Sequence, residues 1–252
     1  MRTRPLTRVL DEHWLSLPDR SVRSLRAGVP RAGAPPLVLV PGLGALGYLV
    51  PLVLACAAWT RVHLLDVPGF GQRRTARSTA TLAAVSDAVA GWIEASFDRP
   101  VLLMGHSTGA QAALRATTAT PDRVGALVLG GPTFPPSARR VMGLAGSVLR
   151  TLPAEHPAML PAAAPEYLRG RQRLLQMLRD AMADAPERRI PDVDHPLLVI
   201  SGQRDAIAPP SWGAQLAADA ARGRCELLSA GHNFPFTHPV TTSLLGRRAV
   251  AG

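Results

Sequence analysis

The stretch LLMGHSTGAQAA (residues 102–113) decides the fold, because an apolar run enters it and a helical pattern of small residues leaves it. Its centre, GHSTG at 105–109, matches the pattern G-x-S-x-G. A strand-to-helix turn this sharp strains the serine backbone, and only glycine avoids collisions two residues to either side. The stretch predicts that the Ser107 hydroxyl stands above a sheet at a helix N-terminus, where negative charge is favoured. A plain serine helix cap is the alternative.

Apolar runs alternate with helical patterns along the rest of the chain. This alternation predicts a mostly parallel, twisted α/β sheet with helices on both faces. The segment 21–28 alternates with period two and is interpreted as an edge strand or as half of a hairpin. The patterns 81–97 and 107–119 predict helices. The runs interpreted as buried strands are 36–42, 61–71, 99–105, 123–131, 196–205 and 223–232.

Between residues 133 and 192 the alternation stops, and the sequence becomes rich in Pro and Arg. The segments 137–152 and 165–185 predict helices. We interpret 133–192 as a helical lid inserted before the strand that carries Asp205, over a core formed by 1–132 and 193–252. Open α/β sheets bind ligands at the carboxyl ends of their strands, where such a lid would lie. A long structural crossover is the alternative.

Composition excludes several classes of protein. The net charge is +10, and every Lys or Arg position of the chain is an arginine. These arginines are scattered along the sequence and aromatic residues make up only 4% of it, which argues against nucleic-acid binding. Residues 32–60 carry no charge, yet their Pro and Gly residues break the run, so we expect a strand, a loop and a helix, with no stable membrane insertion. Cys56 and Cys225 are expected to be reduced thiols, and the N-terminus lacks a signal-peptide pattern, so we expect a cytoplasmic protein.

A nucleophilic serine needs a base and a carboxylate that orients the base. His232 follows the last predicted strand, on the same sheet edge as Ser107, and we expect it to be the base. His238 is the rival, although it stands where the terminal helix is expected to begin. Asp205 ends the fifth predicted strand, and we expect it to fix the histidine tautomer. Asp66 is the rival carboxylate, interpreted as holding the glycine turn that follows it.

These motifs together resemble the α/β-hydrolase superfamily, in its lid-bearing, single-domain group of serine hydrolases. The resemblance covers most of residues 20–248, and the chain order Ser, Asp, His is the order expected for that fold. The matching segments are VLVPGLGALG, LLDVPGFGQ, LLMGHSTGAQAAL, LLVISGQRDAIAPP and SAGHNFPFTHP.

The resemblance also implies an oxyanion hole made of the backbone N–H groups of Leu43 and Thr108. His106, inside the nucleophile elbow between Gly105 and Gly109, is expected to pack beside the serine. The chain departs from the family at Pro41, where many relatives have histidine.

The predicted function is hydrolysis of a small to medium, largely apolar carboxylic ester, thioester or lactone through an acyl-enzyme, without cofactor or metal. The run 42–47 also matches G-x-G-x-x-G, but the triad explains that loop better. A carbon–carbon hydrolase of a diketone, or a cofactor-free perhydrolase or haloperoxidase, would use the same three residues. A catalytically silent ligand-binding receptor is the alternative of another class. The expected partner is a small-molecule substrate, and the oligomeric state is left open.

Overall fold

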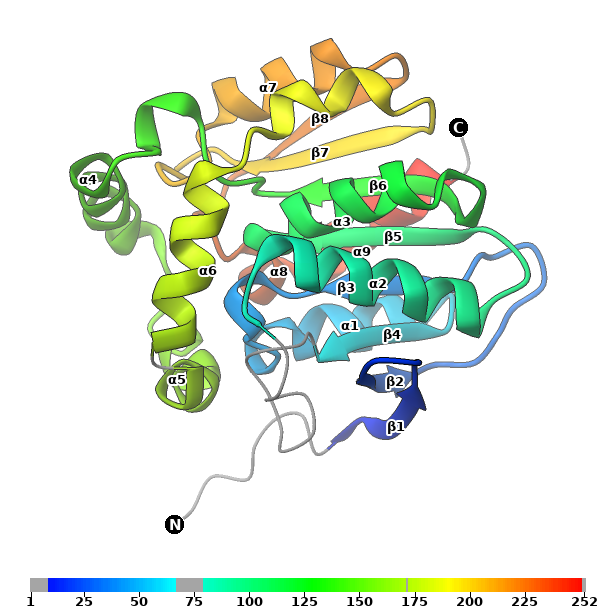
Figure 1. The fold of residues 1–252 in the computed structure, drawn as a ribbon. Coiled ribbons are helices and arrows are strands. Elements are labelled where there is room, and N and C mark those ends of the chain that lie inside the picture. Colours follow the sequence, from blue (N-terminus) through cyan, green and yellow to red (C-terminus); the bar gives the residue numbers. More distant parts are fainter. Residues whose placement is uncertain (1–8, 67–78, 171, 251–252) are drawn as a thin grey trace.

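The computed structural model describes residues 9–66, 79–170 and 172–250, and its strands form one eight-stranded sheet (Figure 1). The order of the strands across the sheet is β1-β2-β4-β3-β5-β6-β7-β8. Their bounds are β1 (Asp11–Ser16), β2 (Ser21–Ala27), β3 (Leu37–Val40), β4 (Val62–Asp66), β5 (Val101–His106), β6 (Val124–Gly130), β7 (Leu197–Gly202) and β8 (Gly223–Leu228).

The sheet is mostly parallel, as predicted. Every neighbouring pair from β4 to β8 is parallel, whereas β2 runs antiparallel to both β1 and β4. The segment 21–28 is therefore the second half of a hairpin, with β1 outside it as the edge strand. Parallel strands end at one edge of the sheet, so the loops that follow β3, β5, β7 and β8 lie near one another.

Helices cover both faces of the sheet, and each face buries its own apolar cluster. The cluster on one face includes α2, α3 and α7, and the cluster on the other includes α1, α8 and α9. The α-helices are α1 (Val50–Ala57), α2 (Leu82–Ser96), α3 (Thr108–Ala119), α4 (Val141–Thr151), α5 (Met159–Gly170), α6 (Gln172–Ala183), α7 (Pro210–Asp219), α8 (Phe234–Thr237) and α9 (Pro239–Ala249). The 3-10 helices are η2 (Gly42–Gly44), η3 (Gly47–Leu49), η5 (Pro121–Arg123), η6 (Pro136–Ala138), η7 (Leu152–Ala154), η8 (Pro186–Arg188) and η9 (Ile190–Asp192).

The uncharged stretch 32–60 divides as predicted, into the strand β3, the short turns η2 and η3, and the helix α1. Three of its side chains, Leu49, Leu52 and Val53, are fully buried. They belong to the apolar cluster on the face of the sheet that α9 covers. Among the described residues, no helix has the length and apolar character needed to cross a membrane.

The helices α4, α5 and α6 lie together beyond one end of the sheet (Figure 1). They belong to what we call the inserted segment, residues 133–192, between β6 and β7. The predicted helix over 165–185 is not one straight helix, because α5, described up to Gly170, and α6, described from Gln172, run in different directions (Figure 1). A Cβ at Gly170 would lie only 2.9 Å from Leu174 Cγ, so glycine leaves room for a side chain of α6.

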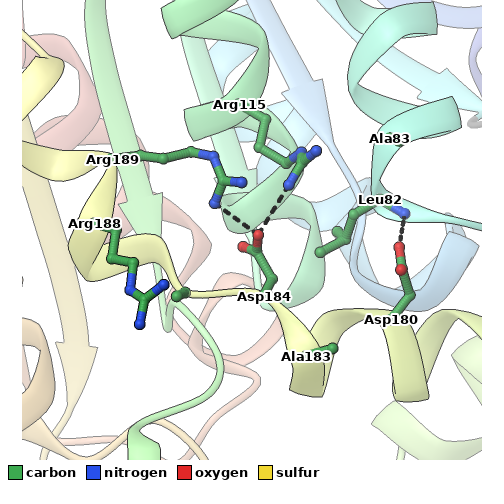
Figure 2. A pocket seen from close by; sticks show the side chains of 9 residues that line it. Leu82, Ala83, Arg115, Asp180, Ala183, Asp184, Arg188 and Arg189 are labelled. Carbon is green, nitrogen blue, oxygen red and sulfur yellow. Dashed lines mark hydrogen bonds and ion pairs between the residues drawn. The ribbon is translucent and has the colours of Figure 1, made fainter.

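An ionic cluster fastens the end of α6 to the core, and Figure 2 shows its geometry. Asp184 lies just after α6, and its Oδ1 accepts hydrogen bonds from Arg115 of α3 at 2.9 Å and from Arg189 at 2.7 Å. One turn earlier, Asp180 accepts the backbone N–H of Leu82 at 2.5 Å, at the start of α2. The Asp184 side chain is only 4% exposed, so its charge depends on these arginines for solvation.

We predict that Asp184→Asn lowers the free energy of unfolding by about 2 kcal/mol, because it removes the charge that pairs two partly buried guanidinium groups. Urea unfolding at neutral pH measures the change. Asp194→Asn is the control, since Asp194 is an exposed carboxylate in the loop before β7. Equal stability of the two variants would contradict the role of the cluster.

Candidate active site

Ser107 occupies a sharp turn between β5, which ends at His106, and α3, which begins at Thr108. Its backbone has φ 58° and ψ −126°, in a region that residues other than glycine rarely adopt. A Cβ at Gly105 would lie 2.2 Å from the carbonyl oxygen of Gly109, and one at Gly109 would lie 2.4 Å from that of Val40. Both glycines are therefore needed for the chain to turn this tightly.

His232 and Asp205 meet Ser107 in one hydrogen-bonded chain. His232 Nε2 lies 3.0 Å from Ser107 Oγ, and His232 Nδ1 lies 2.7 Å from Asp205 Oδ2. All three side chains are buried. His232 lies four residues after β8 and Asp205 three after β7, so loops rather than strand ends carry them. The structure brings together the three residues that the sequence predicted.

The surroundings of His232 set its tautomer and its pKa. The Asp205 carboxylate accepts from Nδ1–H, which leaves Nε2 as the acceptor for the Ser107 hydroxyl. Burial lowers the pKa of His232, but the charge and hydrogen bond of Asp205, together with the charge of Glu155, outweigh burial, so that the pKa is raised above its ordinary value of 6.5. Asp205 Oδ1 is itself held by the backbone N–H groups of Ile207 at 2.8 Å and Ala208 at 2.9 Å.

The loop after β3 passes directly beside Ser107. A Cβ at Gly42 would lie 2.8 Å from the Ser107 Cβ, so glycine is required for this approach. Leu43 has φ 47°, and its backbone N–H donates to Thr108 Oγ1 at 2.9 Å. The expected oxyanion donors, Leu43 and Thr108, therefore stand next to each other and next to the serine.

His106 links two loops of the site to the turn at Ser107. Its Nε2 lies 3.0 Å from the carbonyl oxygen of His232, so this nitrogen carries the proton and donates. Its Nδ1 then accepts from the Tyr48 hydroxyl at 2.8 Å, and the Tyr48 oxygen accepts from Gly42 N–H at 3.0 Å. Burial, reinforced by the nearby His232, lowers the pKa of His106 to about 3, which keeps the ring neutral.

The rival residues lie elsewhere. His238 is the residue just before α9, and its Nδ1 lies 2.8 Å from Thr237 Oγ1. Asp66 forms a buried ion pair with Arg23 of β2 at 2.7 Å. The glycine turn that we expected Asp66 to hold lies outside the described residues.

Sequence reasoning did not single out two residues that contact the site, Tyr48 and Glu155. A tyrosine in an apolar stretch is expected to be a core residue, and only the folded structure shows that Tyr48 contacts His106. In the part of the chain that the structure describes, no cluster of three or more His, Cys, Asp or Glu side chains could hold a metal ion.

The family follows from comparison with known proteins. The model of the Alpha/beta hydrolase family matches residues 37–242, so the chain belongs to this family. The predicted fold and the predicted class of enzyme, a hydrolase, are thereby confirmed.

Two curated proteins of different named activities are similar in sequence to this chain. The dihydrolipoyllysine-residue acetyltransferase component of an acetoin cleaving system from Pseudomonas putida is 31% identical over 71% of this chain. The chain spans 54% of the length of that relative. A pimeloyl-[acyl-carrier protein] methyl ester esterase from Stenotrophomonas maltophilia is 29% identical over 80% of this chain and 87% of the esterase.

Solved structures agree on the fold. An enol-lactonase from Burkholderia xenovorans superposes with a TM-score of 0.79 at 19% identity, over 95% of this chain and 100% of that one. A thermophilic esterase from Thermogutta terrifontis gives a TM-score of 0.77 at 20% identity, over 96% and 98% of the two chains. At these identities the likeness concerns the fold alone.

We predict that Tyr48→Phe lowers the free energy of unfolding by about 1 to 2 kcal/mol, because Gly42 N–H and His106 Nδ1 both lose a buried partner. Thermal or urea unfolding measures the change. Tyr167→Phe in α5 is the matched control, as Tyr167 is the other tyrosine of the chain. A loss no larger than that of the control would refute the link between the two loops.

Proposed function

We propose that the chain is a serine hydrolase in which Ser107 is the nucleophile, His232 the general base and Asp205 the residue that orients the base. The observation that carries this proposal is the hydrogen-bonded chain from Ser107 Oγ through His232 to Asp205, at 3.0 Å and 2.7 Å, on a strained strand-to-helix turn. A serine that served only as a helix cap would need neither this backbone conformation nor a buried histidine on its hydroxyl.

The geometry supports an acyl-enzyme mechanism. His232 Nε2 takes the Ser107 proton as Oγ attacks the substrate carbonyl, and Asp205 stabilises the imidazolium that forms. The imidazolium then gives this proton to the leaving group, and neutral His232 activates the water that releases the acid. The backbone N–H groups of Leu43 and Thr108 hold the oxyanion. Since Leu43 N–H points at Thr108 Oγ1 in the resting protein, the oxyanion takes over or shares this donor.

The substrate in this proposal is a small to medium, largely apolar carboxylic ester, thioester or lactone, and the inserted segment serves as the lid. The curated esterase relative supports an ester substrate, and the acetyltransferase relative bears an acyl-transfer name. The inserted segment supports a lid because it lies beyond the sheet end from which Ser107 projects. A carbon–carbon hydrolase or a perhydrolase would use the same three residues, so substrates decide among them.

The first test is covalent. A fluorophosphonate probe should label the native protein at Ser107, and Ser107→Ala should remove the label. His232→Ala should slow labelling strongly, because it removes the base while leaving the hydroxyl in place. Absence of labelling in the native protein, or equal labelling of Ser107→Ala, would exclude the proposed nucleophile.

The second test defines the substrate. With p-nitrophenyl esters of increasing acyl length, we expect kcat/KM to be highest for short to medium chains and to fall by about 10⁴-fold or more in Ser107→Ala. Turnover of a vinylogous diketone without ester turnover would favour the carbon–carbon hydrolase. Labelling by the probe without turnover of any substrate class would leave the receptor as the better account.

Activity should rise with pH through the pKa of His232. The base must be neutral to accept the serine proton, and its pKa is raised above 6.5, so kcat/KM should be lost as pH falls through a midpoint above 6.5. The measurement is the pH profile of kcat/KM for a neutral ester, whose own ionisation does not contribute. A midpoint below 6.5 would show that the carboxylates of Asp205 and Glu155 do not outweigh the effect of burial.

A further inference from the structure

Glu155 of the inserted segment accepts hydrogen bonds from the backbone of the loop that carries His232. Glu155 Oε1 accepts the N–H of His232 at 2.6 Å and the N–H of Asn233 at 3.2 Å. Glu155 Oε2 accepts from the Asn233 side chain, Nδ2, at 2.8 Å. One carboxylate thus accepts from two consecutive backbone N–H groups, that of the proposed base and that of the residue after it.

The residue before His232 is shaped to this contact. A Cβ at Gly231 would lie 2.6 Å from Glu155 Oε1 and 2.9 Å from the carbonyl oxygen of Ala154. Only glycine therefore lets the carboxylate reach the backbone. The absence of a side chain at residue 231 is thus a steric requirement of the contact between Glu155 and the His232 loop.

The part of the inserted segment that carries Glu155, residues 147–155, which we call the arm, also contacts the loop that carries Asp205. Thr151, at the end of α4, accepts the N–H of Ala206 through Oγ1 at 2.9 Å and donates to the carbonyl oxygen of Ser147. Thr151 and Glu155 are four residues apart, and each holds a backbone N–H at or next to a triad residue. The arm 147–155 is therefore in contact with both loops at once.

We propose that Glu155 is a positioning residue for the triad, which fixes His232 by its backbone and places a negative charge beside the imidazolium that forms during catalysis. This inference rests on the proposed function and extends it to a residue outside the core of the fold. It makes the inserted segment part of the catalytic frame, in addition to any role as a lid.

The charges around His232 come from several elements. Asp205 faces Nδ1 from the loop after β7, and the neutral His106 lies with its ring 5.0 Å from that of His232. Glu155 adds a second negative charge from the inserted segment, and it contributes to raising the pKa of His232. Removing the Glu155 charge alone should therefore lower the pKa of His232, while Asp205 still holds the tautomer.

The decisive experiment measures this pKa in the resting protein, without turnover. In a Ser107→Ala background labelled with ¹⁵N-histidine, the His232 resonances are titrated by NMR with and without Glu155→Gln. Glutamine keeps an acceptor oxygen for the loop but removes the charge. Glu94→Gln, on the exposed side of α2, makes the same change in net charge and is the control. We expect a lower His232 pKa in Glu155→Gln alone, and an equal pKa in both variants overturns the proposal.

Kinetics test the positioning. In Glu155→Gln we expect the acid limb of kcat/KM to move to lower pH, and in Glu155→Ala we expect kcat to fall by about 10- to 100-fold with a smaller change in KM. An unchanged kcat in Glu155→Ala, together with an unchanged pH profile in Glu155→Gln, overturns the proposal. If the native protein turns over no substrate and takes no label, the proposed function fails, and the NMR titration still decides whether Glu155 acts on His232.

Discussion

The strained turn at Ser107 is the constraint on which the rest of the site depends. A non-glycine residue at φ 58° and ψ −126° costs about 1 to 3 kcal/mol, and it persists only where the surroundings fix it. Here the neighbouring backbone fixes the turn. The start of α3 lies so close to β3 and β5 that neither Gly105 nor Gly109 has room for a Cβ. Packing of the core thus forces the hydroxyl out of the sheet, and the strain is offset by the apolar burial on both faces.

His106 turns this local constraint into a shared geometry. The ring is buried and neutral, and its two nitrogens have different partners, the carbonyl of His232 and the hydroxyl of Tyr48. Because Tyr48 in turn accepts from Gly42 N–H, the loops that carry the proposed base and the proposed oxyanion donor are tied to the same side chain. The elbow therefore sets the position of both loops relative to the serine.

The sequence predicted what depends on local pattern and strand order. The glycines around Ser107 state a steric requirement directly, and Asp205 and His232 could be found because both follow parallel strands that end at one edge. The strand β1 was missed, since DEHWLS is polar and largely exposed and becomes a strand only by pairing with β2. Glu155 was missed because its role depends on where the inserted segment packs, which no periodicity encodes.

The inserted segment contacts each part of the proposed machinery. Thr151 holds the loop of Asp205, and Glu155 holds the loop of His232. Its helix α5 lies against the loop that carries Leu43, where a Cβ at Gly47 would be 2.1 Å from the carbonyl oxygen of Ala162. Substitutions that shift this segment should therefore also shift the loops that carry His232, Asp205 and Leu43. In the proposed role of a lid, substitutions in this segment should change kcat as much as KM, because the same contacts hold the proposed catalytic residues.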